Sequence, residues 1–140
     1  MADNLIQVEG VDKLIKKLLK KADQETINQT LGRACALVER SAKQKAPKGD
    51  GNLRRSISSK VENNQGIVFT PLEYAPYVEY GTGLFAEDGN GRKDVPWHYQ
   101  DEKGEWHTTS GMHPQPYMRP ALNENREEIL RIIKEGITNG

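Results

Sequence analysis

The pattern of apolar residues predicts α-helices at both ends of the chain. Residues 11–19 place apolar side chains at separations of three and four, which is the spacing of one stripe along a helix. A second helix is predicted from Asp23, a residue suited to an N-cap, to Lys45, and Pro47 ends it. The last helix is expected to start at or just after Pro120, because proline is accepted at a first helical position.

Between these helices the pattern changes to the alternation typical of β-strands. Apolar and polar side chains alternate over residues 53–61, and residues 67–70 are expected to return as the second strand of a hairpin. Residues 74–80 are interpreted as an edge strand, since Pro76 has no backbone N–H to donate. A long loop is predicted over residues 81–94, followed by a second hairpin that turns at residues 101–104.

This order of elements predicts an α+β fold, with N-terminal helices and a C-terminal helix packed on one face of a small antiparallel sheet. The chain of 140 residues is expected to form one domain, residues 1–140, with a flexible loop and hairpin insertion at about residues 83–111. Only 35% of the residues are apolar and 29% are charged. We therefore expect part of the apolar burial to be completed against partners.

Charge and cysteine content narrow the possible functions. The 20 basic and 20 acidic side chains cancel, so the composition does not favour a nucleic-acid binder. The single cysteine, Cys35, excludes an internal disulfide framework, and its apolar helical context predicts a buried thiol. No signal-like segment and no membrane-length apolar run is apparent. A soluble protein made in a cytoplasm is therefore expected.

Candidate catalytic chemistry is sparse. The three histidines, His98, His107 and His113, have no accompanying cysteine and no helical metal-binding pair, and the serines lack a Gly-x-Ser-x-Gly context. We therefore expect a protein that is not an enzyme, with no catalytic residue, no metal and no cofactor. Two alternatives stay open. One is a small metal-binding enzyme that uses these histidines, and the other is a DNA-binding accessory protein that uses the lysine face Lys13–Lys21.

Three segments, taken in order, resemble a known family. The first runs from Val38 to Ile57 and contains Ala-Pro and then Gly-Asn-Leu-Arg-Arg-Ser-Ile. The second is Tyr-Ala-Pro-Tyr-Val-Glu-Tyr-Gly-Thr at residues 74–82, and the third is Gln-Pro-Tyr-Met-Arg-Pro-Ala-Leu at residues 115–122. Together they resemble the HK97 gp10-like family of tailed-phage neck and tail-completion proteins. The chain departs from the family pattern at Asp50, where threonine is frequent, at Tyr117, where phenylalanine is usual, and in an elaborated hairpin.

The resemblance implies a structural protein of a phage or prophage virion. Such a protein would assemble as a homo-oligomeric ring at the neck or the top of the tail tube, in head–tail joining or tail completion. Neighbouring neck and tail-tube proteins would be its partners, and no membrane would be involved. DNA would pass through the ring lumen without sequence-specific binding.

Two groups of residues are predicted to matter. The planar guanidinium group of arginine suits pairing with carboxylates of a partner, and tryptophan is favoured at protein interfaces. The candidate interface residues are Arg54, Arg55, Tyr77, Glu79, Trp97 and Trp106. The residues expected to determine the fold are Pro47, Gly51, Tyr74, Tyr80, Gly81, Pro116, Tyr117 and Pro120. The two tryptophans also have a second interpretation, in which they face each other across the predicted hairpin and only stabilise it.

Overall fold

The computed structural model describes residues 5–7, 23–49, 51–89, 91–101 and 103–138. The chain divides into two compact units. Residues 1–72 and 117–140 form one, called here the helix–sheet unit, and residues 73–116 form the other, called the β4–β5 unit after its hairpin. The helix predicted from Val11 and the lysine face Lys13–Lys21 lie outside the described residues.

The long helix α2 (Gln24–Lys45) is the central element of the helix–sheet unit. Its predicted N-cap is confirmed, because Oδ1 of Asp23 accepts a hydrogen bond from the Thr26 N–H at 2.7 Å. At the other end Ala46 leaves the helix with extended backbone, as expected for a residue that precedes a proline. The apolar residues that α2 buries follow helical spacing and include Ile27, Leu31, Ala34, Val38 and Ala42.

A three-stranded antiparallel sheet packs beside α2, in the strand order β1-β3-β2. The strands are β1 (Leu5–Gln7), β2 (Ser58–Glu62) and β3 (Gln65–Phe69). The predicted hairpin β2–β3 is confirmed, and its tight turn places Asn63 and Asn64 at φ of 50° and 59°, a conformation that asparagine tolerates. A Cβ built on Gly66 would collide with Sγ of Cys35, so this glycine lets β3 approach α2 closely.

Cys35 lies in the contact between α2 and β3. The residue is only 2% exposed, and this burial raises the pKa of its thiol from 9.0 to about 11, with a further contribution from the charge of Glu39. The prediction of a buried cysteine is confirmed. Because the thiolate is the reactive form, Cys35 is chemically inert in the folded protein.

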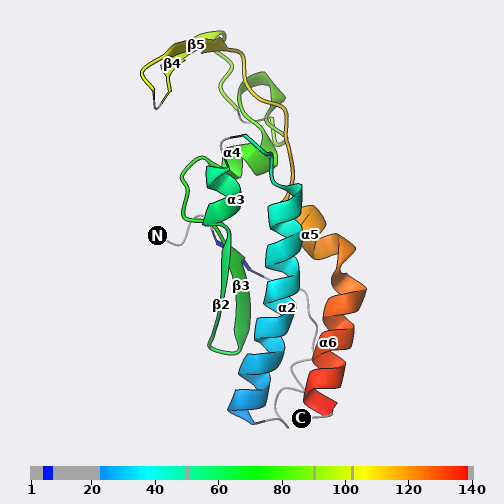
Figure 1. The fold of residues 1–140 in the computed structure, drawn as a ribbon. Helices are drawn as coiled ribbons and strands as arrows, with labels where there is room; N and C mark the ends of the chain where they lie inside the picture. Colours follow the sequence, from blue (N-terminus) through cyan, green and yellow to red (C-terminus); the bar gives the residue numbers. More distant parts are fainter. Residues whose placement is uncertain (1–4, 8–22, 50, 90, 102, 139–140) are drawn as a thin grey trace. The chain divides into compact units, whose positions relative to one another are not determined.

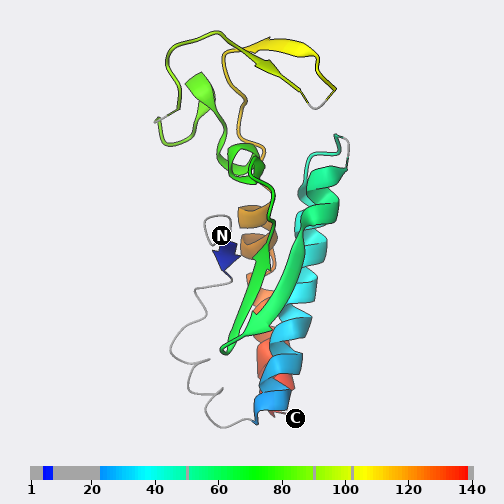
Figure 2. The ribbon, with the colours of Figure 1, turned by 90° about the vertical axis from the view of Figure 1, so that its left-hand side faces the viewer.

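The C-terminal segment forms two helices, α5 (Met118–Glu124) and α6 (Arg126–Thr138), and both pack against α2. Figure 1 shows α2 lying between the β2–β3 hairpin and α6, and Figure 2 shows the same elements from the side of the hairpin. The predicted single helix from Pro120 is therefore corrected in two respects. Helix α5 begins two residues earlier than predicted. The helical segment is also interrupted at Asn125, whose side-chain amide donates a hydrogen bond to the Ala121 carbonyl at 2.7 Å.

The first residues of the predicted strand 53–61 form a short helix, α3 (Asn52–Ser56), and only the following residues form β2. Leu53 and Ile57, which are 5% and 1% exposed, are four residues apart and therefore project from the same side of one turn. Gly51 precedes the helix with a φ of 81°, in the left-handed region that glycine adopts without strain. The prediction of an alternating strand pattern was therefore wrong for the first residues of this segment, which follow a helical period.

The observed architecture confirms the predicted α+β class, with helices and antiparallel sheets in one chain. None of the helices among the described residues has both the length and the apolar character that crossing a membrane requires.

Candidate interaction surface

The described residues of the β4–β5 unit form four regular elements. They are the helix α4 (Ala75–Tyr80), the 3₁₀ turn η2 (Gly83–Phe85), and the strands β4 (Trp97–Gln100) and β5 (Trp106–Thr109). The last two confirm the predicted second hairpin. Tyr74 caps a helix that runs over residues 75–80, so the interpretation of residues 74–80 as an edge strand was wrong.

Helix α4 separates buried from exposed side chains with a helical period. Ala75, Val78 and Glu79 are buried, whereas the three tyrosines are exposed at 39%, 57% and 43% for Tyr74, Tyr77 and Tyr80. Pro76 lies in the first turn, where a missing backbone N–H costs nothing because no helical acceptor is available there. The three tyrosines of the segment that was interpreted as an edge strand are therefore a stripe along a short helix, which we call the tyrosine stripe.

Two backbone segments of the β4–β5 unit meet next to this helix. The Leu84 N–H donates to the Ser110 carbonyl at 3.0 Å, and Thr82 and Met112 exchange backbone hydrogen bonds of 2.9 and 3.3 Å. Gly83 is in the left-handed region with a φ of 60°, and a Cβ on it would lie 2.8 Å from Cα of Gly111. The approach of these two segments therefore depends on glycine.

Gly81 ends α4 with a φ of 82° and donates its N–H to the Tyr77 carbonyl at 2.8 Å. A Cβ at this position would lie 2.8 and 2.9 Å from the backbone oxygens of Phe85 and Met112. A side chain here would meet backbone atoms that cannot move aside easily, which accounts physically for a glycine in the sequence motif.

The register of the β4–β5 hairpin separates its two tryptophans. Trp97 is opposite Thr109, and Trp106 is opposite Gln100, so the two rings do not face each other as the second interpretation required. Because neighbouring residues alternate between faces, Trp97 and Trp106 also lie on opposite faces of the hairpin. Trp97 stacks with the guanidinium of Arg92, whose Cζ lies 5.0 Å from the ring centroid, while Trp106 is 69% exposed.

The same register separates the histidines of the metal-binding alternative. His98 pairs with Thr108, to which its ring Nδ1 is hydrogen-bonded at 2.8 Å, whereas His107 stacks on Tyr99 on the other face. His113 stacks on Phe85, with 3.9 Å between the ring centroids. The structure therefore does not assemble these three side chains into one site.

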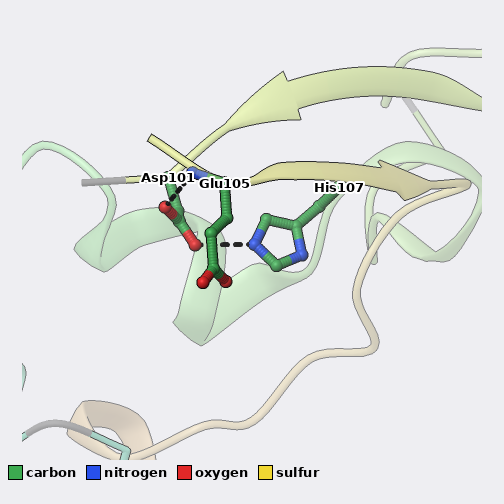
Figure 3. Close-up of side chains that lie close together, drawn as sticks. All are labelled: Asp101, Glu105 and His107. Atoms are coloured by element: carbon green, nitrogen blue, oxygen red, sulfur yellow. Dashed lines mark hydrogen bonds and ion pairs between the residues drawn. The ribbon is translucent and has the colours of Figure 1, made fainter. Parts of the chain in front are cut away.

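A different group lies at the turn of the hairpin (Figure 3). Within the described part of the chain, Asp101, Glu105 and His107 place one potential ligand atom each within 4.8 Å of one another. Both oxygens of Asp101 are already engaged, because Oδ1 accepts from the N–H groups of Lys103 and Glu105, and Oδ2 bonds Nε2 of His107 at 2.7 Å. This arrangement closes the hairpin turn, and we assign it that structural role.

The turn is expected to open in acid. The hydrogen bond with His107 lowers the pKa of Asp101 below its ordinary 3.8, and bonds from two backbone N–H groups add to the shift. Since the pKa is lower in the folded protein, ionised Asp101 stabilises the hairpin above about pH 3.8. That stability is lost as the pH falls through the folded-state pKa. Cross-strand nuclear Overhauser effects between Tyr99 and His107 should weaken in that range.

Asp101→Asn should weaken the same signals already at neutral pH, and Asp94→Asn, which changes an exposed carboxylate elsewhere in the unit, should leave them unchanged. An Asp101→Asn hairpin that keeps the wild-type signals and acid midpoint would contradict the assigned role.

The remaining candidate interface residues lie in different environments. Arg55 is exposed and donates from Nη2 to Asn52 Oδ1 at 2.6 Å. Arg54 is half-buried, and its Nε is buried without a hydrogen-bond partner in the described structure. Glu79 is 1% exposed, so its carboxylate lies inside the folded chain and we leave it out of the interface proposed below.

Comparison with known proteins supplies the family. The family model described as "Bacteriophage HK97-gp10, putative tail-component" matches residues 10–81, slightly more than half of the chain. The chain belongs to the HK97 gp10-like family. The match includes the segment from Val38 to Ile57 and all but the last residue of the tyrosine motif, and the motif at residues 115–122 lies beyond it. No curated protein and no solved structure gives a significant match.

Membership makes this HK97 gp10-like protein a bacteriophage tail component. Its place is accordingly in the virion, in association with other virion proteins. Of the residues that the family match covers, α4 with its tyrosine stripe is the part that belongs to the β4–β5 unit. Reasoning from the sequence found the motif but not the helix, because a six-residue segment is too short for its period to be read reliably.

Proposed function

We propose that this HK97 gp10-like protein assembles as a ring at the neck or the top of the tail tube and acts in head–tail joining or tail completion. Family membership supports a structural role in the tail. The observation that carries the finer proposal is the distribution of exposed apolar side chains. Seven of the eight large apolar side chains exposed among the described residues belong to the β4–β5 unit.

Such a concentration is expected at a protein–protein interface. Single exposed apolar residues are common, but grouped ones mark surfaces that a partner covers. The most exposed members are Trp106 at 69%, Tyr77 at 57% and Leu84 at 57%. Tryptophan and tyrosine are the residues that most often dominate binding energy at interfaces. The β4–β5 unit therefore has the composition of an assembly surface.

The other parts of the proposal follow from a ring of identical copies in the virion. Copies are made in the host cytoplasm, assemble with neighbouring neck and tail-tube proteins, and leave a lumen for DNA. A chain with equal numbers of acidic and basic side chains suits that lumen, because passage requires that phosphates are not held. We propose no catalytic step for this protein.

Deleting the reading frame from the parent phage tests the assembly role. We expect electron microscopy of lysates to show DNA-filled heads apart from tails, or tails with a defective upper end. The wild-type chain supplied from a plasmid should restore joined particles. Intact, joined particles from the deletion phage would contradict the proposal.

The same complementation assay tests the exposed surface. Trp106→Ala should fail to restore joined particles while circular dichroism of the purified variant stays unchanged, because a side chain 69% exposed contributes little to folding. Leu130→Ala is the matched control, since Leu130 is also exposed, at 44%, but lies in the helix–sheet unit.

A further inference from the structure

The two units of the chain carry opposite net charges. The β4–β5 unit has eight acidic and three basic side chains, an excess of five negative charges. The helix–sheet unit has 17 basic and 12 acidic side chains, an excess of five positive charges. A chain that is neutral overall is therefore complementary to another copy of itself when unlike units meet.

The outer face of α2 offers a basic strip in the helix–sheet unit. Arg33, Ala36 and Arg40 are exposed, and α2 uses its other sides to contact the sheet and the helices α3, α5 and α6. Arg33 and Arg40 are seven residues apart, so about 10 Å of helix axis separates them. Neither arginine forms an ion pair with a described acidic residue. We call Arg33, Ala36 and Arg40 the α2 strip.

The tyrosine stripe has the chemistry that such a strip binds. A guanidinium stacks on aromatic faces and pairs with carboxylates, and a small residue between two arginines leaves room for a ring. Tyr77, at the centre of the stripe, is 57% exposed. Glu73, which directly precedes the first tyrosine of the stripe, is also exposed and supplies a carboxylate. The stripe and the α2 strip are thus matched both in charge and in the type of contact.

We propose that the tyrosine stripe of one copy docks on the α2 strip of the next copy. This inference rests on the proposed ring, and it specifies which surfaces meet. Because the two surfaces are different, one copy can use each of them toward a different neighbour. Such a head-to-tail contact, repeated around an axis, closes a ring when its rotation returns to the first copy. A face-to-face pair would instead bring two acidic β4–β5 units together, which their charges oppose.

Disulfide trapping between two single variants tests this contact. One plasmid supplies Ala36→Cys and a second supplies Tyr77→Cys, both in a host infected with the deletion phage. The particles are purified, oxidised with copper phenanthroline and run on a non-reducing gel. Native Cys35 does not interfere, because it is buried. A band of twice the chain mass should form from the mixture and not from either variant alone, since each variant carries only one of the two cysteines that the proposed contact brings together.

Glu135→Cys, an exposed position on α6, replaces Ala36→Cys in the control and should give no such band with Tyr77→Cys. Dimers from Tyr77→Cys alone would show a face-to-face contact and overturn the proposal. Particles that contain both variants without the mixed dimer would overturn it too, and would leave the proposed assembly role intact. Absence of the wild-type protein from joined particles would instead remove the assembly role, and the inference with it.

Charge reversal provides a second measurement that does not depend on cysteine. Glu73→Arg alone and Arg33→Glu with Arg40→Glu should each lower the yield of joined particles in the complementation assay, and all three changes in one chain should restore part of it. Lys48→Glu, which reverses another exposed base of the helix–sheet unit, should not rescue Glu73→Arg. Equal failure of the single and combined variants would contradict the pairing.

Discussion

Gly83→Val is expected to disrupt the β4–β5 unit. Gly83 has a φ of 60°, a Cβ there would lie 2.8 Å from Cα of Gly111, and it would also collide with the Ser110 carbonyl oxygen. The left-handed conformation alone costs a branched residue about 1–3 kcal/mol, and relief of the backbone collision adds to that. We expect a total loss of about 3–5 kcal/mol in the opening free energy of this unit.

Native-state hydrogen exchange measures this loss directly. The Leu84 N–H bonds Ser110 and the Met112 N–H bonds Thr82, so both amides report separation of the two segments. Gly89→Val is the matched control, because Gly89 also has a positive φ, of 74°, but nothing lies within 4 Å of its built Cβ. If the two variants change the opening free energy at the Leu84 amide by equally small amounts, the backbone collision at Gly83 is not what determines the stability of this unit.

Tyr117→Ala is expected to destabilise the helix–sheet unit strongly. Tyr117 is 1% exposed and is among the largest fully buried side chains. Removing its ring leaves a cavity beside α5, and such truncations of buried aromatic residues cost about 3–5 kcal/mol. For a chain of this size we expect the melting temperature to fall by about 10–20 °C.

Thermal unfolding followed by circular dichroism tests this, with two comparisons. Tyr117→Phe keeps the ring and should cost only about 1 kcal/mol. Tyr77→Ala removes a ring that is 57% exposed and should shift the melting temperature much less than Tyr117→Ala. A melting temperature for Tyr117→Ala that equals that of Tyr77→Ala would contradict the assignment of Tyr117 to the core.

The sequence predicts long elements better than short ones, and the reason is visible in particular residues. Helix α2 spans 22 residues, so its apolar period and its Asp23 cap are unambiguous. Helices α3 and α4 have five and six residues, less than two turns, which is too short for a period to be read reliably from the sequence. Leu53 and Ile57 fit either period until the backbone is known.

Pairing register was the second feature that the sequence left open. The order of the hairpin residues predicts that β4 and β5 pair, but not that the Asp101 turn places Trp97 opposite Thr109. A different loop closure would change every cross-strand neighbour. The exposure of Trp106 and the separation of His98 from His107 follow from this register. The aromatic candidates for an interface could be predicted from the sequence, and their arrangement could not.

The burial of Cys35 gives the protein an internal reporter of its own opening. A thiol that is 2% exposed, with a pKa raised to about 11, is protected from alkylating reagents while α2 stays on β3. The rate at which a maleimide labels the wild-type chain therefore measures how often that contact separates. Counting labelled and unlabelled chains by mass, before and after incorporation into particles, would reveal whether assembly slows this breathing, without any engineered probe.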